Sequence, residues 1–520
     1  MTNTKLPDHY KLPTWFQIIL ILSIVIGIFL RFYHLEQKVY SFDETFSSTY
    51  IYGQHEQAYE NVDGSVLSRN EIKKYVFIDP NKTLIESLGH VISNVYVFPP
   101  LYPIFSILWS YLLQNWQNDS IVIQRSLSAL LSVIALIGIY WLGIELFDSK
   151  TSALVATVIM AISPFHFQYA QIIRPYSILT AATVISCACL LKAMRVKILF
   201  WWVIYGFSVV LGLYSNVLFA FVVLGHIGYF IITEKFRDLK SLTAYFLTLG
   251  ISTLAFLPWL WTFVTSRMLG YSVGQVADRS SFLLLIRAWF KGIQTLFVDL
   301  YNPFFTANFF KAAQWFFTPI ILAIATIALY TLCRYAPSKI KNFLLVLAIA
   351  TGISLMVRDL LSGSSISSRM RYLIPFLLAI ELMVAYLIGS LLNASQSSRR
   401  RWGQFALSVL VVCGISSCLT ISQSKSWSAF DSPHFPKIAE TINLANSPLI
   451  LVTNLDRALS ISFLVDSDTK FKIIKNDLTI PDGFNTVFIL EPAVKVREQL
   501  REKYTLVEVH PLSRLFQIKK

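Results

Sequence analysis

The sequence has few charged residues and few cysteines for its length. Only 14% of its 520 residues are charged while 55% are hydrophobic, and the mean hydropathy is +0.57. Soluble cores cannot bury that much apolar side chain, and disordered chains contain far less of it. The five cysteines show neither metal-like spacing nor the density of a disulfide framework. A soluble enzyme, a disordered chain and a disulfide-bonded secreted module are therefore excluded.

Acidic residues are fewer than basic ones, 30 against 44, which gives a net charge of +14. In a soluble protein this excess would favour nucleic acid as a partner. In a chain this apolar, the basic cytoplasmic loops of a membrane protein explain it better. We therefore expect a lipid bilayer around the chain and no nucleic-acid partner.

Long apolar runs predict eleven membrane spans. A bilayer core needs about 20 mainly apolar residues per helix. The first run has no small-residue cleavage site, so we expect a retained anchor. Runs of suitable length begin near residues 15, 122, 151, 177, 199, 216, 242, 315, 342, 372 and 403.

One shorter apolar segment decides the orientation. Residues 99–113 open with three prolines, and only if they do not cross the membrane do the basic loops lie with the N-terminus on the cytoplasmic side. We therefore predict an outer interfacial or re-entrant helix here, a cytoplasmic N-terminus and a bacterial plasma (inner) membrane. The basic residues of these loops are Lys150, Lys192, Arg195, Lys197, Lys235, Arg237, Lys240, Arg334, Lys339, Lys341, Arg399, Arg400 and Arg401.

This orientation leaves two long outer loops, 34–121 and 265–314, and an outer tail. In the second loop, residues 281–298 have the pattern of an interfacial helix. The predicted fold is an α-helical polytopic membrane domain over 1–422, followed by a small extracytoplasmic α/β domain over 423–520. In the tail we expect strands at 448–454, 486–492, 505–510 and 515–519, and helices at 434–445, 456–465 and 493–503.

Chemistry-bearing residues gather in the predicted outer segments. Asp43 and Glu44 follow the first span within an aromatic, apolar stretch, and either a solvated pair or a catalytic pair fits them. Arg174, beside Tyr176, either reaches lipid headgroups or holds a phosphate. The same two interpretations apply to Arg358, Arg369 and Arg371 around a Gly/Ser-rich turn. His166 lies in an apolar run, where a packed histidine is the better interpretation.

Four motifs in order resemble the GT-C glycosyltransferases, in particular the group of protein O-mannosyltransferases (glycosyltransferase family 39) and lipid A aminoarabinose transferases. They are Asp43-Glu44, PPLY at Pro99–Tyr102, the stretch IQRSLSALLSVIALIGIYWLGIELF at 123–147 and SPFHFQYAQIIRPYSIL at 163–179. The resemblance covers roughly residues 15–400. It implies inverting transfer of a hexosyl or pentosyl group from a polyprenyl-phosphate-linked donor at the outer membrane face, to a lipid, glycan or protein acceptor of the cell envelope.

The resemblance also implies roles for particular residues. Asp43 would be the general base, and Glu44 would orient the acceptor or support Asp43. The residues expected to bind substrate are Arg174, Tyr176, Arg369, Arg371, Tyr372, Pro100 and Tyr102. Aminoarabinose transferases have a metal-binding glutamate just before the PPLY position, where this chain has Val97 and Phe98. We therefore expect no obligatory metal or other cofactor, with a divalent metal as the open alternative.

Two other interpretations remain open. A polyprenyl-linked glycolipid transporter or flippase would also need many spans and a phosphate site, and it would place charged residues along a path through the spans. Glu381 is the clearest carboxylate in mid-span, and no inverted repeat is visible. The other interpretation is a catalytically inactive scaffold that presents the tail to partners.

Overall fold

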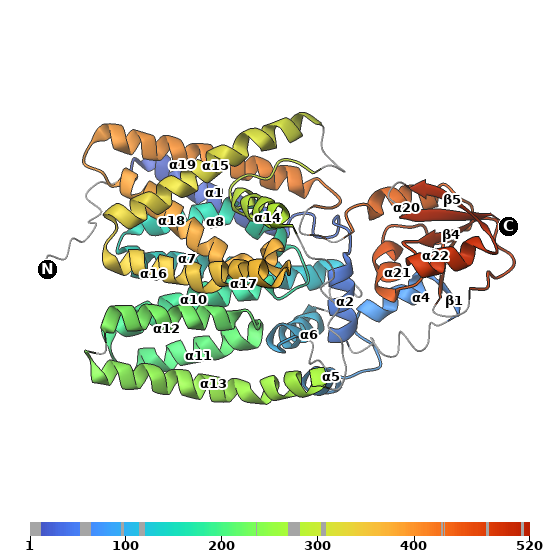
Figure 1. Cartoon of the computed structure of the whole chain (residues 1–520), viewed down its shortest axis with the longest axis horizontal. Helices are drawn as coiled ribbons and strands as arrows, with labels where there is room; N and C mark the ends of the chain where they lie inside the picture. The colour runs from blue at the N-terminus through green and yellow to red at the C-terminus, as the bar shows by residue number, and fades with distance from the viewer. Residues whose placement is uncertain are drawn as a thin grey trace.

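The computed structural model shows a bundle of long helices with a small α/β domain at one end (Figure 1). The chain is an α-helical polytopic membrane protein, which confirms the predicted fold class. The structure describes residues 12–52, 64–94, 98–113, 120–235, 237–268, 281–302, 308–427, 430, 432–474, 478–510 and 514–519.

Helices stand at each of the eleven predicted span positions. Eight of them are long and apolar enough to cross a bilayer, and the bent pair α8 and α9 makes a ninth. Helices α11 and α12 are apolar but have only 17 and 16 residues, so eleven crossings stay a prediction. The bundle consists of α1 (Thr14–Phe32), α7 (Ile121–Phe147), α8 (Lys150–Ile162), α9 (Pro164–Ala170), α10 (Tyr176–Val196), α11 (Leu199–Ser215), α12 (Phe219–Glu234), α13 (Leu239–Met268), α15 (Asn308–Tyr335), α16 (Ser338–Ala348), η2 (Ile349–Ile353), α17 (Ser354–Ser362), α18 (Ile374–Leu392) and α19 (Ser397–Ser422).

Helix α8 is a buried central element of the bundle, with 11 of its 13 residues buried. Its neighbours approach it at glycines. A Cβ on Gly143 of α7 would lie 2.6 Å from the Cα of Ala153, and one on Gly389 of α18 would lie 2.2 Å from the Oγ of Ser152 and 3.0 Å from its Cα. Small residues at such crossings let helix backbones come close enough for dense packing. Any larger residue would push these helices apart.

The bend after α8 has a local cause in the sequence. Pro164 has no N–H to continue the hydrogen bonding of α8, but it suits the first position of a new helix. Helix α9 therefore starts at Pro164 and departs at 59° from α8. This bend carries the chain across the end of the bundle towards Arg174.

Short helices gather at the end of the bundle next to the α/β domain (Figure 1). Helix α6 has 13 residues and a length of about 20 Å, too short for a hydrocarbon core of about 30 Å, as predicted for 99–113. Helix α14, within the predicted segment 281–298, is seen end-on and so runs across the bundle. These elements are α2 (Phe42–Ile51), α4 (Arg69–Lys73), η1 (Lys74–Val76), α5 (Leu84–Asn94), α6 (Leu101–Leu113), α14 (Phe282–Thr295), η3 (Ile366–Ser368) and η4 (Met370–Leu373).

The α/β domain is built on a six-stranded sheet of order β1-β3-β2-β4-β6-β5. Strands β3, β2 and β4 are parallel, and the other pairings are antiparallel. All four predicted strands form, and sequence analysis missed β1 and β3. Because β1 comes from the first outer loop, the sheet extends beyond the predicted bounds of 423–520. The elements are β1 (Val66–Ser68), α20 (Phe435–Asn443), β2 (Leu449–Val452), α21 (Leu455–Ser462), β3 (Lys470–Ile473), β4 (Val487–Leu490), α22 (Val494–Arg501), β5 (Thr505–His510) and β6 (Leu515–Lys519).

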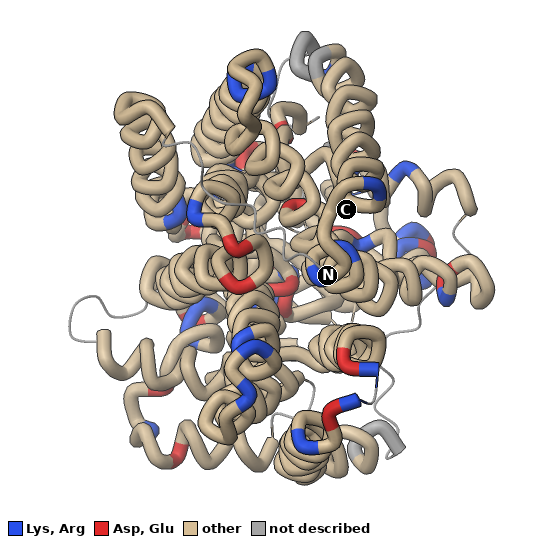
Figure 2. Tube along the Cα trace, turned by 90° about the vertical axis from the view of Figure 1, so that its left-hand side faces the viewer, with Lys and Arg blue, Asp and Glu red and all other residues tan. Residues whose placement is uncertain are grey.

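Lys and Arg residues lie at helix ends at the far end of the bundle, which Figure 2 views. Ion pairs connect neighbouring hairpins there. Lys197 reaches Glu234 at 3.3 Å and Asp238 at 2.8 Å, and Arg195 reaches Glu145 at 2.8 Å. The structure thus separates the basic hairpins from the α/β domain, as the predicted topology requires.

The glycine contacts on α8 give a stability prediction. Gly389→Leu should lower the melting temperature of the purified protein by several degrees, because overpacking a close contact costs about 1–3 kcal/mol. Gly250→Leu in α13 is the matched control, since a Cβ there meets nothing within 4 Å. Scanning fluorimetry in detergent compares the two variants. Equal melting temperatures would contradict the assigned α8–α18 contact.

Candidate active site

Asp43 and Glu44 lie in the first turn of α2, at the end of the bundle that carries the α/β domain. Ser41 starts the helix with a capping box: its N–H and its hydroxyl both donate to Glu44 Oε2, each at 3.0 Å. This arrangement satisfies donors that a helix N-terminus otherwise leaves free. Successive helix residues point about 100° apart, so the two carboxylates face different surroundings.

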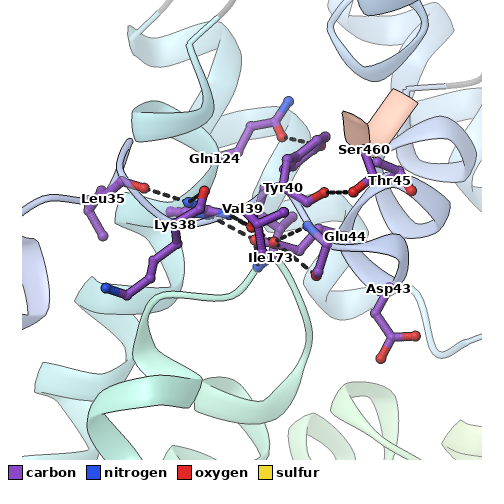
Figure 3. Close-up of polar contacts among 12 residues, drawn as sticks. Leu35, Lys38, Val39, Tyr40, Asp43, Glu44, Thr45, Gln124, Ile173 and Ser460 are labelled. Atoms are coloured by element: carbon purple, nitrogen blue, oxygen red, sulfur yellow. Dashed lines mark hydrogen bonds and ion pairs between the residues drawn. The ribbon is translucent and has the colours of Figure 1, made fainter. Parts of the chain in front are cut away.

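Glu44 faces the protein interior and is completely buried. The buried Arg125 of α7 holds it through two hydrogen bonds, from Nε to Oε1 at 2.9 Å and from Nη2 to Oε2 at 2.8 Å. The backbone N–H of Ile173 adds a third donor at 3.1 Å. Figure 3 shows this network around Glu44. These contacts enclose the Glu44 carboxylate, and its predicted role, to orient the acceptor or to support Asp43, stays a prediction.

Arg125 also organises the loop before α2. Its guanidinium donates to three backbone carbonyls, those of Leu35 at 2.6 Å, Lys38 at 3.1 Å and Val39 at 2.9 Å. Together with the two bonds to Glu44 these contacts use all five of its N–H donors. The loop is therefore fixed around a single buried cation, and α2 begins at a defined place.

Asp43 points away from this network (Figure 3). Its side chain is 18% exposed and pairs with Arg371 of η4, whose side chain is 11% exposed. Arg174 also contacts this turn of α2: its Nη1 donates to the Ser47 hydroxyl at 2.7 Å and to the main-chain oxygen of Asp43 at 3.4 Å. The structure thus brings one accessible carboxylate and two arginines together from three segments distant in the sequence.

Two predicted tyrosines accompany these arginines. The Arg174 guanidinium carbon lies 5.8 Å from the ring centroid of Tyr176, and that of Arg371 lies 5.6 Å from the centroid of Tyr372. Such contacts restrain the direction of each guanidinium while leaving N–H donors for an anion. Two of the predicted substrate-binding residues, Arg174 and Arg371, therefore contact Asp43, and each has a predicted tyrosine beside its guanidinium.

The loop that carries Arg371 is anchored at two points. Asp359 accepts hydrogen bonds from the Ser364 hydroxyl and from the backbone N–H of Ser367. Trp289 of α14 donates to the Ser367 hydroxyl at 3.0 Å. These anchors fix the chain just before η4. They also link the position of Arg371 to the crosswise helix α14.

The other predicted site residues lie apart from Asp43 in the contacts that the structure describes. Arg369 is exposed, and its side chain makes no hydrogen bond or ion pair among the described residues, although its backbone N–H donates to the carbonyl of Ile366 at 3.2 Å. Tyr102 is buried, and its hydroxyl pairs with Ser128 of α7 at 2.9 Å. Pro100 starts α6 by accepting a hydrogen bond from Ile104. Their substrate-binding roles stay predictions.

The α/β domain and the last span hold the loop and helix that carry Asp43. Lys38 Nζ donates to the carbonyls of Ile421, Ser422 and Ser424 at the end of α19. Burial, followed by the charge of Arg125, lowers the pKa of Lys38 to about 7. From α21, the Ser460 hydroxyl donates to the Tyr40 carbonyl. The sequence analysis did not predict these contacts of Lys38 and Ser460.

Two predictions about buried groups can be compared with the structure. His166 is packed, as predicted, with its Nε2 2.9 Å from Glu381 Oε2. The mid-span carboxylate Glu381 therefore has a partner inside the bundle. Among the described residues, no three His, Cys, Asp or Glu side chains cluster as metal ligands would, and the absence of an obligatory metal stays a prediction.

Sequence analysis missed Arg125 and Ser47. A signal for Arg125 was present: an arginine stands in the first turn of an otherwise apolar span, and a charge there needs a partner. Ser47 gave no signal, because a serine one helical turn after Asp43 matters only once Arg174 is placed beside it. Both residues contact partners that are distant in the sequence: Arg125 binds Glu44, and Ser47 accepts a hydrogen bond from Arg174.

Comparison with known proteins supports the resemblance over part of the chain. Residues 98–261 match the model of the dolichyl-phosphate-mannose-protein mannosyltransferase family. The GT-C resemblance is thereby confirmed over this segment. It contains three of the four motifs, while Asp43 lies outside it. No curated protein matches the chain in sequence.

Several solved structures are similar in arrangement at low identity. ArnT from Cupriavidus metallidurans, bound to undecaprenyl phosphate, is 13% identical with a TM-score of 0.44, covering 98% of each chain. The oligosaccharyltransferase of Archaeoglobus fulgidus, tethered to an acceptor peptide, is 12% identical with a TM-score of 0.44, covering 88% of this chain and 64% of its own. The same enzyme, AglB, with an inhibitory peptide and a dolichol-phosphate has a TM-score of 0.43 at 12% identity, covering the same shares.

Replacing each of the two adjacent carboxylates should lower the stability of the protein to a different extent. Glu44→Gln should destabilise the protein by about 3 kcal/mol, because it leaves the buried Arg125 without its counter-ion. Asp43→Asn should change stability by less than about 1 kcal/mol, since it removes only a partly exposed ion pair. Melting temperatures of the two variants in the same detergent give the comparison. Equal losses would show that Glu44 does not anchor the helix.

Proposed function

We propose that the protein is an inverting glycosyltransferase that moves a sugar from a polyprenyl-phosphate-linked donor to an acceptor. The observation that carries the proposal is the accessible Asp43 carboxylate flanked by Arg174 and Arg371. A base and two cations are what transfer from a lipid phosphate requires, since that leaving group needs no nucleotide-binding fold. The matched family, whose description names a dolichyl-phosphate sugar, supports the same donor class.

The reaction follows from the positions of these groups. Asp43 accepts the proton of the acceptor while the acceptor atom bonds to the anomeric carbon. The bond from that carbon to the phosphate oxygen breaks, and the polyprenyl phosphate leaves with the electron pair. Arg174 and Arg371 stabilise the charge that develops on this phosphate. Attack from the face opposite the leaving group inverts the anomeric configuration.

Arg371 serves two anions in this mechanism. Without substrate it pairs with Asp43, and its positive charge balances the negative charge of this carboxylate. A donor phosphate offers a second negative charge to the same guanidinium, which can bind oxygens through several N–H groups. Donor binding thus weakens the hold of Arg371 on Asp43 when the base is needed.

The placement of the short helices supports an interfacial reaction. Helix α2, whose first turn carries Asp43, lies with α6 and α14 towards the α/β domain (Figure 1), opposite the basic hairpins. By the positive-inside rule that end is extracytoplasmic and the N-terminus is cytoplasmic. The isoprenoid tail would lie among the apolar helices, and no obligatory metal takes part. The cell membrane of a bacterium is the proposed location.

Asp43→Asn should reduce sugar transfer by about 10²–10⁴-fold, because it removes the general base. The measurement is release of free polyprenyl phosphate by purified protein in liposomes, with a panel of polyprenyl-phosphate sugars. Donor binding should survive in the variant. Undiminished release would place the base elsewhere. No release from any donor by the wild type, with movement of lipid between leaflets, would favour a transporter.

Arg174→Gln and Arg371→Gln should each weaken binding of polyprenyl phosphate about 10-fold or more, since a hydrogen bond to a charged group contributes about 1.5–3 kcal/mol. Arg195→Gln is the control, because its side chain is 56% exposed and pairs with Glu145 among the basic hairpins at the far end of the bundle. Thermophoresis with labelled lipid measures all three. Equal affinities across the set would remove these arginines from the donor site.

A further inference from the structure

The sheet of the α/β domain has a point where its strand connections diverge. From β2 the chain passes through α21 to β3 on one side, and from β4 it passes through α22 towards β5 and β6 on the other. Strands β2 and β4 are parallel neighbours. In open α/β sheets, ligands bind outside the carboxyl ends of the strands at such a switch point. The residues just after β2 and β4 are therefore the first place to look for a ligand site in this domain.

A cluster of charges occupies this switch point. Glu491 immediately follows β4, Arg457 lies in the first turn of α21 after β2, and Arg514 directly precedes β6. Both arginines pair with Glu491, Arg514 Nη1 with Oε1 at 2.5 Å and Arg457 with Oε2. His434 completes the cluster, with its Nε2 2.7 Å from Glu491 Oε1. Four separate chain segments thus converge here.

The cluster has an excess of positive charge at its surface. The Glu491 side chain is 5% exposed, whereas those of Arg457 and Arg514 are 33% and 41% exposed. Among the described residues, no other carboxylate pairs with either arginine. One carboxylate thus faces two guanidiniums that retain outward N–H donors. Burial, followed by the charges of Arg514 and Arg457, lowers the pKa of His434 to about 4.

The backbone at Glu491 is also unusual. Its φ is +44°, a left-handed conformation that non-glycine residues adopt rarely and at an energetic cost. The Glu491 N–H donates to the carbonyl of Arg514 at 2.8 Å, which fixes this turn against the start of β6. The structure therefore holds the carboxylate between the arginines in spite of local strain.

The cluster lies close to the helix that carries Asp43. The Thr45 hydroxyl of α2 donates to the carbonyl of Asp456 at 3.2 Å, and Arg457 is the next residue. Helix α21 stands on the side of the α/β domain nearest α2 (Figure 1). A molecule bound to Arg457 and Arg514 would therefore lie on the side of the α/β domain that contacts α2.

We propose that the switch point between β2 and β4 is an anion site, where Arg457 and Arg514 bind a phosphate or carboxylate group of the sugar acceptor. The Glu491 carboxylate pairs with both arginines when the acceptor is absent, and an acceptor anion that binds more tightly or carries two charges displaces it. Only the assignment of the anion to the acceptor rests on the proposed function. Anion binding itself does not depend on sugar transfer.

Inorganic phosphate is the probe that tests the site, with acetate as the carboxylate probe. Because Arg174 and Arg371 also attract phosphate, the titration uses full-length Arg371→Gln protein in detergent, followed by calorimetry. We expect saturable binding in this background and at least 10-fold weaker binding after Arg457→Gln and Arg514→Gln are added. Arg501→Gln, on the exposed end of α22, is the control and should leave the affinity unchanged.

Glu491→Gln separates a ligand site from a purely structural ion cluster. If Glu491 competes with the ligand, this variant should bind phosphate several-fold more tightly, whereas a structural cluster would lose melting temperature without any gain in affinity. Polyprenyl phosphate should bind the Arg457→Gln/Arg514→Gln protein as it binds wild type. Absence of phosphate binding, or binding indifferent to Arg457 and Arg514, would overturn the site even if sugar release is observed.

Discussion

The arrangement around Asp43 depends on one buried ion pair, that of Arg125 with Glu44. Burying a guanidinium is costly unless every donor finds an acceptor, and Arg125 meets that condition only by collecting three carbonyls from the loop before α2. The loop and the helix therefore adopt one arrangement together. Since Arg125 and the capping residue Ser41 both donate to the Glu44 carboxylate, the start of α2 and the position of Arg125 depend on each other.

This constraint explains how two adjacent carboxylates acquire different properties. Because Glu44 must face Arg125, the helical turn directs Asp43 to another side of α2, where Arg371 and Arg174 meet it. The buried carboxylate is fully engaged by donors, and the outward one keeps partial access to solvent. A catalytic base needs such access, together with a fixed position. In the mechanism proposed above, Glu44 would fix the start of α2 and Asp43 would act as the base.

The sequence allowed prediction of the features that depend on local pattern. Long apolar runs indicated the positions of the long helices, short continuous apolar runs indicated β2 and β4, and the segments at 505–510 and 515–519 indicated β5 and β6. It did not reveal β1, because a three-residue strand has no pattern of its own and forms only by pairing with β3. Arg369 and Arg371 looked equivalent in the sequence. The turn of η4 separates them, leaving Arg369 exposed and directing Arg371 to Asp43.

Contacts between segments distant in the sequence could not be predicted from local patterns, because they form only when the chain has folded. The loop before α2 is held by Lys38 at the end of α19, some 380 residues later, and by Ser460 of α21. Neither residue has a neighbour in sequence that indicates its partner. These contacts make the α/β domain part of the framework that holds Asp43, because α21 contacts both the loop and α2. Because of these contacts, a displacement of α21 must act on α2, so the proposed binding of an acceptor at the α/β domain would be mechanically linked to the position of Asp43.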